Sequence, residues 1–221
     1  MIIAIDGPAG SGKSSTAKLV GSKMNFLYID TGAMYRAMAL KAFLSEIAYD
    51  DRDNVVKLLP GTEIVQDIDN DTVETRTFLD GRDVSFEIRT PEISKGVTSV
   101  CEIDEVRSKL VELQREMGRK DNVILDGRDI GTVVFPDADL KFFMVADVDI
   151  RAQRRLKELK EKGIGSTFEE VKQDIERRDL RDSSRSNSPL KPAEDSILID
   201  TTKMTIEQQA EFIIGMIKEK L

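Results

Sequence analysis

The segment GPAGSGKS (residues 7–14) constrains the fold of this chain more than any other stretch, and it follows the apolar run MIIAI directly. It has the spacing G-x-x-x-x-G-K-[ST], with Gly7, Gly12, Lys13 and Ser14 at the fixed positions, and the helix-forming run AKLVGSKM follows closely. A buried strand, a glycine loop and a helix in this order favour a phosphate-binding loop over a ligand-free glycine turn. The sequence therefore predicts an ATP or GTP site after the first strand.

The chemistry of this loop is divided between its backbone and two side chains. Backbone N–H groups of a glycine-rich loop and the positive end of the next helix attract phosphate. Lys13 is expected to reach the outer phosphates, and Ser14 is the expected ligand of Mg²⁺. The expected nucleotide-binding residues are Gly7, Pro8, Ala9, Gly10, Ser11, Gly12, Lys13, Ser14 and Ser15.

Composition excludes several classes of protein. A chain of 221 residues with 40% apolar content can bury the core of one domain with an insertion. The absence of histidine excludes histidine metal ligands and histidine general bases, and the single Cys101 is expected to be a small buried apolar side chain. No uninterrupted apolar run comes near the length of about 18 residues that a membrane helix needs. The N-terminus is expected to enter a structural strand instead of a signal peptide. We therefore expect a cytoplasmic protein without a membrane partner.

The distribution of charge points to a small anionic ligand. The net charge of −8 argues against a general nucleic-acid binder. Arginines nevertheless gather in residues 151–185, whereas acidic residues dominate residues 50–83. A local arginine field in an acidic protein suits a small polyanion. We expect a monomer that binds small nucleotides and no nucleic acid.

Hydrophobic periodicity predicts alternating strands and helices. Strand-like apolar runs occupy residues 2–5, 26–29, 123–125, 142–146 and 197–199. Helical patterns lie near residues 13–24, 33–47, 103–119, 150–161, 168–182 and 205–219. This order predicts an α/β fold of the P-loop NTPase type, with five parallel strands in one sheet and helices on both of its faces. Aspartates 6, 30, 126 and 147 follow strands and are expected at the ligand-binding edge, unless they only cap helices.

Two segments interrupt this alternation. Residues 62–88 contain three short strand-like runs separated by DND and by Asp80-Gly81, a hairpin signal. They predict a small antiparallel insertion, with an irregular acidic loop as the alternative. Residues 162–166 (KGIGS) separate two helices, and arginines flank them on both sides, as a mobile lid over the site would require.

Two strand-following segments carry candidate acceptor-binding residues. In DTGAMYR (residues 30–36), Arg36 lies in the first turns of a helix and can hold a second phosphate group, unless it is only a surface arginine. In DGRDIGTVVFPDA (residues 126–138), Asp126 can order Mg²⁺-bound water or an arginine, Arg128 suits phosphate, and Asp129 can accept from a base amine. A salt-bridged structural turn is the alternative for the second segment.

The segment RDLRDSSR (residues 178–185) carries a third set of charges. Helical spacing places Arg178, Asp182 and Arg185 on one face, with Arg181 four residues before Arg185. Taken alone, this run fits a solvated helix of ion pairs. Beside the arginines of residues 151–155 it resembles a phosphate clamp.

These segments, together with EIRTPEIS and SPLKPAEDSILIDT, occur in the order and spacing of bacterial cytidylate kinase, and the chain resembles that family of nucleoside monophosphate kinases over essentially its whole length. The resemblance implies ATP-dependent phosphorylation of CMP and dCMP with Mg²⁺. It also implies one domain, residues 1–221, with three parts. These are a P-loop core (residues 1–60, 92–150 and 186–221), a monophosphate-binding insertion (61–91) and a mobile lid (151–185).

The resemblance also implies roles for individual residues. By position, the ATP phosphates lie on residues 7–14, with Thr16 just beyond. Arg36, Arg128 and Arg185 hold the acceptor phosphate, Arg178 and Asp182 meet the pentose hydroxyls, and Arg107 and Asp129 read cytosine. Thr98 stands where the family has a base-contacting serine, and the neighbouring Ser99 is the alternative. Lid residues Arg154 and Arg181 approach the transferring phosphoryl group, and it is open whether Arg151 or Arg155 shares that task.

The residue chemistry and the family resemblance together give the expected site residues. The expected catalytic residues are Lys13, Arg128, Arg154 and Arg181, and the expected metal ligand is Ser14. The expected substrate-binding residues are Thr31, Tyr35, Arg36, Thr98, Arg107, Asp126, Arg128, Asp129, Arg178, Asp182 and Arg185. Two rivals remain, namely another P-loop kinase acting on UMP, AMP or shikimate, and a non-enzymatic nucleotide switch. The acceptor-side arginines argue against a switch, because a switch needs no second phosphate site.

Overall fold

The computed structural model describes residues 1–68, 75–119, 121–161 and 163–221. The chain divides into two compact units, one made of residues 1–26 and 123–221 and the other of residues 27–122. These boundaries follow spatial compactness, so the division into core, insertion and lid stays a prediction. None of the helices in the described part of the chain combines the length and apolar content that crossing a membrane requires.

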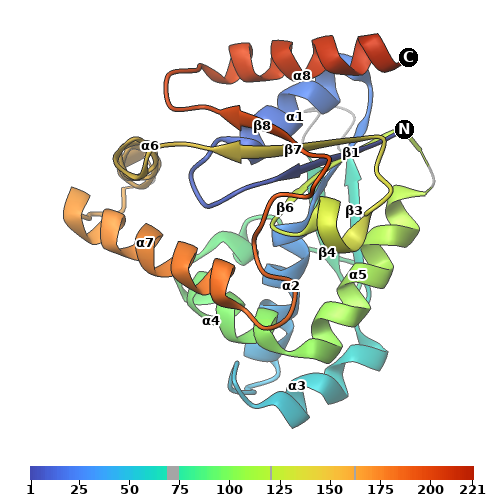
Figure 1. Ribbon diagram of the computed structural model, residues 1–221. Helices are drawn as coiled ribbons and strands as arrows, with labels where there is room; N and C mark the ends of the chain where they lie inside the picture. The colour runs from blue at the N-terminus through green and yellow to red at the C-terminus, as the bar shows by residue number, and fades with distance from the viewer. Residues whose placement is uncertain (69–74, 120, 162) are drawn as a thin grey trace. The chain divides into compact units, whose positions relative to one another are not determined.

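The main sheet is parallel, and its strand order is β2-β6-β1-β7-β8 (Figure 1). Its strands are β1 (Ile2–Asp6), β2 (Leu27–Asp30), β6 (Val123–Gly127), β7 (Leu140–Val145) and β8 (Ile197–Asp200). In the first unit, Ala4 of β1 is paired with Leu125 of β6 and Lys141 of β7. Ile3, Ala4 and Ile5 of β1 and the apolar residues of β6 are buried, as strands covered on both faces must be. The predicted α/β fold with a five-stranded parallel sheet is confirmed.

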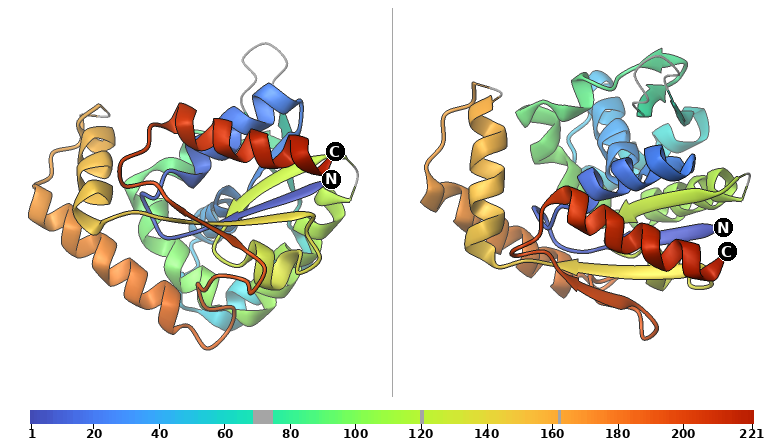
Figure 2. Two further views of the ribbon diagram at one scale, coloured as in Figure 1. Left: turned by 45° about the horizontal axis from the view of Figure 1, so that its top comes forward. Right: turned by 90° about the horizontal axis from the view of Figure 1, so that it is seen from above.

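The helices of the first unit are α1 (Lys13–Met24), α6 (Val148–Glu161), α7 (Phe168–Ser184) and α8 (Ile206–Lys220), with a π-helical turn, η3 (Ile130–Val134). Helices α1 and α8 lie side by side on one face of the sheet (Figures 1 and 2). The buried residues Ala210, Ile213 and Ile217 form one face of α8, which explains why its apolar pattern predicted a helix.

Helices α6 and α7 form a hairpin in the region predicted to be the lid (Figure 1). A small apolar cluster of Ala152, Val171 and Ile175 holds the two helices together. A capping box between Thr167 and Glu170 begins α7. The hairpin agrees with the two predicted helices, whereas the movement of the lid stays a prediction. Lys162, in the predicted hinge, lies outside the described residues.

The second unit contains the predicted antiparallel sheet, made of β3 (Ile64–Ile68), β4 (Thr75–Leu79) and β5 (Arg82–Asp83). Asp80 and Gly81 join β4 to β5 with φ angles of 51° and 79°. Two successive positive φ angles are the requirement of the tight hairpin turn that this residue pair predicts. The predicted small antiparallel sheet is confirmed. The first predicted turn, residues 69–71, lies outside the described residues.

The helices of the second unit are α2 (Thr31–Leu44), α3 (Arg52–Leu58), α4 (Pro91–Glu102) and α5 (Asp104–Gly118), with short 3-10 turns η1 (Leu59–Gly61) and η2 (Glu87–Arg89). Helices α3 and α4 were not among the predicted helices. The sequence nevertheless carries the start signals of α4, because Thr90 caps it and Pro91 occupies its first position.

Candidate active site

Close packing and a left-handed backbone conformation explain two glycines of the phosphate loop. A Cβ atom on Gly7 would lie 2.2 Å from the carbonyl oxygen of Met144 in β7, so no larger residue fits there. Gly12 is the N-cap of α1, with a φ of 95°, and a Cβ atom on it would lie 2.8 Å from Gln209 Oε1. These two positions require glycine for steric reasons. The loop between β1 and α1 is therefore fixed against its own unit.

Lys13 is buried at the start of α1, with 6% of its surface exposed. Its Nζ donates a hydrogen bond to the carbonyl oxygen of Pro8 at 3.2 Å. Burial and the nearby positive charge of Arg128 lower the pKa of Lys13 to about 7, although Asp126 acts in the opposite direction. An anionic ligand beside Lys13 would stabilise its charged form. The electrostatics of this position thus suit a phosphate group.

The hydroxyl of Ser14 donates to Asp126 Oδ2 at 2.6 Å. This contact joins the first turn of α1 to the end of β6, where the sequence placed both residues. The described residues contain no cluster of three or more metal-binding side chains that could hold an ion by themselves. Mg²⁺ typically takes one or two protein oxygens and completes its shell with waters and substrate phosphates. The oxygens of Ser14 and Asp126 fit such an ion.

Three side chains from later in the chain, Thr201, Gln209 and Arg151, brace the phosphate loop and the first turn of α1. Thr201 Oγ1 donates to the carbonyl oxygen of Ser11 at 2.8 Å, and Thr16 Oγ1 donates to Gln209 Oε1 at 2.6 Å. Arg151 Nη1 donates to the carbonyl oxygen of Ala9 at 3.1 Å. These supporting contacts were not predicted, because no local pattern shows which distant side chain meets a loop carbonyl.

The lid arginines divide into two groups. The buried Arg151 also pairs with Asp179 of α7 at 2.6 Å, so it links the phosphate loop to both lid helices. Arg154 Nη2 donates to the carbonyl oxygen of Thr201 at 2.6 Å. Arg155 pairs with Glu158 on an exposed helix face, and Arg181 is exposed on α7. Roles of Arg154 and Arg181 in phosphoryl transfer remain predictions.

Four aspartates were expected at the edge of the sheet. Asp126 meets Ser14 as described above, and Asp6 accepts hydrogen bonds from the backbone N–H groups of Ile130 and Gly131, each at 2.8 Å. Burial raises the pKa of Asp6 to about 7 despite these two bonds. Asp147 accepts from the backbone N–H of Asp149 at the start of α6, and Asp30 caps α2. The helix-capping alternative therefore holds for the last two.

Among the predicted acceptor-binding residues of the first unit, Arg128 and Asp182 form an ion pair. Arg128 Nε lies 2.7 Å from Asp182 Oδ2, and both side chains are at most 16% exposed. Burial alone would raise the pKa of Asp182, but Arg128, Arg178 and Arg185 outweigh it and hold that pKa below its ordinary value. The helical spacing of residues 178–185 thus correctly grouped these charges. Asp129, the predicted reader of cytosine, is buried next to Arg128.

In the second unit, Arg36 and Arg89 share the carboxylate of Asp30. The Nη2 atoms of both arginines lie 3.1 Å from Asp30 Oδ2, while Asp30 Oδ1 accepts from the backbone N–H of Ala33 at 2.8 Å. Arg36 was predicted as an acceptor-phosphate residue. Arg89 belongs to the segment EIRTPEIS, and no role was predicted for it.

The other predicted substrate-binding residues of the second unit lie on three helices. The guanidinium of the buried Arg107, on α5, is 5.6 Å from the ring centroid of Tyr35 on α2, within the range of a cation–π contact. Thr31 is the first residue of α2 and is buried. Thr98 and its neighbour Ser99 are half-buried on α4, and the choice between them stays open.

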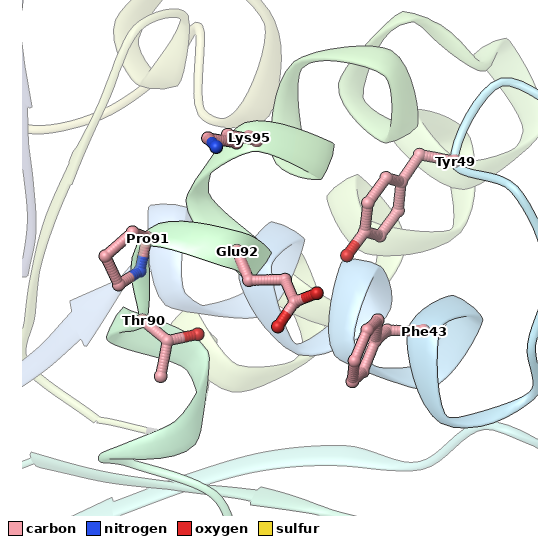
Figure 3. Close-up of a pocket in the computed structure, with 6 residues that line it drawn as sticks. All are labelled: Phe43, Tyr49, Thr90, Pro91, Glu92 and Lys95. Atoms are coloured by element: carbon pink, nitrogen blue, oxygen red, sulfur yellow. The ribbon is translucent and has the colours of Figure 1, made fainter.

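A separate pocket of about 610 Å³ lies in the second unit (Figure 3). It is lined by Phe43, Tyr49, Thr90, Pro91, Glu92 and Lys95. Burial and the charge of Glu92 raise the pKa of Tyr49, whose hydroxyl points toward that carboxylate in Figure 3. None of the predicted site residues lines this pocket, so it is distinct from the predicted nucleotide contacts.

In the parallel sheet, strand β1 leads through a glycine loop to a helix that carries Lys13 and Ser14. This arrangement defines a P-loop nucleotide-binding protein. A sequence model of the family described as cytidylate kinase matches residues 3–219. The chain belongs to the cytidylate kinase family.

Individual relatives agree with this assignment. Cytidylate kinases of Lactobacillus johnsonii and Clostridioides difficile are 46% and 48% identical to this chain, and the matches cover 100% and 98% of it and 95% and 98% of the relatives. A crystal structure of an uncharacterized protein from Eubacterium ventriosum has a TM-score of 0.56 at 14% identity, covering 99% of this chain and 98% of that one. This last likeness concerns the fold alone.

Proposed function

We propose that the protein transfers the γ-phosphoryl group of ATP to CMP and dCMP, giving CDP and dCDP. The observation that carries the proposal is a contact between the phosphate loop and the strand end that bears Arg128. Ser14 of the loop donates to Asp126 at 2.6 Å, two residues before Arg128, and the charge of Arg128 also helps to lower the pKa of Lys13. Membership of the cytidylate kinase family supports the identity of the acceptor.

ATP and Mg²⁺ are the proposed donor and cofactor. The loop of residues 7–14 would hold the ATP phosphates, and Ser14 with Asp126 would hold the ion, whose charge offsets that of the phosphates. Lys13 would supply a further positive charge at the outer phosphates. The hydrogen bonds of Thr201 and Arg151 to loop carbonyls keep this loop in place before the nucleotide arrives.

The proposed reaction needs no general base, which agrees with a chain that contains no histidine. The attacking oxygen of CMP is already anionic, so the protein chiefly positions two polyanions and offsets their repulsion. Arg36, Arg128 and Arg185 are the proposed ligands of the acceptor phosphate, and Arg154 and Arg181 are proposed to stabilise the transferring group. Closure of the α6–α7 lid would exclude water.

Selectivity for cytosine is proposed to rest on its exocyclic amine. Asp129 would accept a hydrogen bond from that amine, whereas UMP presents an oxygen at the same place. Arg107 and Thr98 or Ser99 would complete the contacts to the base, and Arg178 and Asp182 those to the pentose. The protein is further proposed to act in pyrimidine nucleotide metabolism, as a cytoplasmic monomer without nucleic-acid or membrane partners.

A coupled assay of ADP release tests the proposal, with CMP, dCMP, UMP, AMP and shikimate as acceptors. CMP and dCMP should give the highest kcat/KM. Preferential turnover of UMP, AMP or shikimate would assign the protein to another small-molecule specificity. Absence of turnover with every acceptor, while ATP still binds, would favour a nucleotide switch.

A further inference from the structure

The carboxylate of Asp30 is shared by two guanidinium groups that come from different elements of the second unit. Arg36 lies on α2, and Arg89 ends the 3-10 turn η2. The Nη2 atom of each lies 3.1 Å from the same oxygen, Asp30 Oδ2. The two Nη2 atoms can therefore be no farther apart than the sum of these two distances.

The two guanidinium groups have more positive charge and more donors than this carboxylate can satisfy. Among the described residues, Asp30 is the ion-pair partner recorded for both Arg36 and Arg89. Arg36 Nε is buried and has no hydrogen-bond acceptor among those residues. A buried donor without an acceptor is costly, so a ligand that supplies acceptor oxygens and negative charge is favoured here. The missing partner has the chemistry of a phosphate group.

We propose that Arg89 is a second guanidinium of the site that binds the phosphate of the acceptor nucleotide, held beside Arg36 by their shared carboxylate. The inference rests on the proposed function, which assigns the acceptor phosphate to Arg36. A phosphate monoester presents three oxygens, and guanidinium groups bind such oxygens through planar pairs of N–H donors. One phosphate can therefore bridge Arg36 and Arg89 while Asp30 keeps both in position.

The alternative is that Arg89 has only a structural role, in which its ion pair with Asp30 holds η2 against the end of β2. Comparison of CMP with cytidine separates the two roles, because the two ligands differ only in the phosphate. A phosphate ligand should affect the binding of CMP alone, whereas a structural tie should affect both ligands equally.

The experiment measures dissociation constants for CMP and cytidine by chemical-shift titration, a method suited to weak ligands. Arg89→Gln should weaken CMP binding about tenfold or more, since a charge-assisted hydrogen bond is lost, and leave cytidine binding within about twofold. Arg82→Gln is the matched control, because Arg82 pairs with Glu87 on the exposed surface of the same unit. It should change neither constant.

Equal weakening of CMP and cytidine by Arg89→Gln, or no weakening of CMP, would overturn the inference. Arg89→Lys covers the case in which Arg89→Gln does not fold. Its single ammonium group retains the charge opposite Asp30 but loses the guanidinium's planar pair of donors, so CMP should bind about threefold or more weakly. Unchanged CMP binding in that variant would likewise overturn the inference.

Failure of the proposed function gives a different result from failure of this inference. If the wild-type protein binds CMP no better than cytidine and does not phosphorylate it, the proposed function itself is wrong. If the wild-type protein prefers CMP, and Arg36→Gln loses the preference while Arg89→Gln keeps it, only the role of Arg89 is wrong.

Discussion

Lys13 lies where water cannot stabilise its charge, and burial together with Arg128 lowers its pKa to about 7. At about pH 8 most of the ligand-free protein therefore carries a neutral Lys13, while the terminal phosphate of ATP, with a pKa of about 6, is already ionised. Binding of ATP should raise the pKa of Lys13 and take up a proton from the solution. Titration calorimetry in two buffers of different ionisation enthalpy measures this uptake.

Lys13→Arg is the matched control for proton uptake, since a guanidinium stays protonated throughout this pH range. We expect nucleotide binding by this variant to take up close to no proton. Uptake as large as that of the wild-type protein would mean that another group titrates.

Arg128 is expected to be required for turnover. Arg128→Ala removes a guanidinium beside both Lys13 and Asp182, and we expect kcat/KM for CMP to fall about a hundredfold or more. Arg155→Ala is the control, because Arg155 lies on an exposed helix face, where Glu158 is its ion-pair partner within the described parts of the chain. It should change kcat/KM by less than about twofold. Near-normal turnover of folded Arg128→Ala would contradict the assigned role.

Residue chemistry was predictable where a local pattern specifies it. The spacing of the phosphate loop identified Lys13 and Ser14, and helical spacing grouped Arg178 with Asp182. The contact of Arg151 with the carbonyl of Ala9 joins residues 142 positions apart, so it depends on tertiary packing that no local pattern contains. The same reason explains why Arg89 received no role.

At the scale of elements, the capping box of α7 controls a helix with little buried surface of its own. Val171 and Ile175 are the buried residues of α7. Thr167→Ala removes the cap hydrogen bond to the backbone N–H of Glu170, and we expect it to destabilise α7 by about 1 kcal/mol. Hydrogen exchange followed by mass spectrometry should show faster exchange in α7.

Thr205→Ala provides the comparison, because Thr205 and Gln208 form the same capping box on α8. Helix α8 has four buried residues and packs beside α1, so faster exchange should be confined to its first turn. If Thr167→Ala left exchange in α7 unchanged, the cap would not limit the stability of the lid hairpin.

Helix α4 depends on a close contact at Gly96. A Cβ atom there would lie 2.4 Å from the ring of Tyr49. That ring also lines the pocket shown in Figure 3. Alanine favours a helix by about 1 kcal/mol over glycine, but overpacking costs about 1–3 kcal/mol. Gly96→Ala should therefore lower the free energy of unfolding, as measured by urea denaturation. A stabilised Gly96→Ala variant would show that Tyr49 moves without cost.

Elements with strong periodicity were predictable, and elements held by tertiary contacts were not. Helix α8 followed from its apolar spacing, and the turn between β4 and β5 followed from Asp80-Gly81. Helix α3 spans seven residues with Val55 as its buried residue, too short to give a periodic signal. Helix α4 has its buried residues Ile93, Gly96 and Val100 at helical spacing, but the glycine among them weakens the pattern.

At the scale of the whole molecule, the absence of histidine means that no side chain titrates near pH 7 unless the fold shifts its pKa. Asp6 and Lys13 are shifted there from opposite directions, from 3.8 and 10.5 to about 7. Both shifts arise first from burial, which disfavours a carboxylate and an ammonium alike. The ligand-free protein should therefore have an unusual dependence of stability on pH.

Asp6 and Lys13 contribute slopes of opposite sign to the dependence of stability on pH. Between pH 3.8 and about 7 the folded state holds a proton on Asp6 that the unfolded state has released, so this group makes stability fall as pH rises. Between about 7 and 10.5 the unfolded state holds a proton on Lys13 that the folded state lacks, so this group makes stability rise with pH. Together they place a local minimum of stability near neutral pH.

Urea denaturation of the nucleotide-free protein across this range measures the predicted minimum. Asp6→Asn should flatten the falling limb and leave the rising one, whereas Lys13→Met should do the reverse, because each variant removes one titrating group. Retention of the wild-type falling slope in folded Asp6→Asn would show that Asp6 is ionised in the native protein. Its carboxylate would then be stabilised by the N–H groups of Ile130 and Gly131 strongly enough to overcome burial.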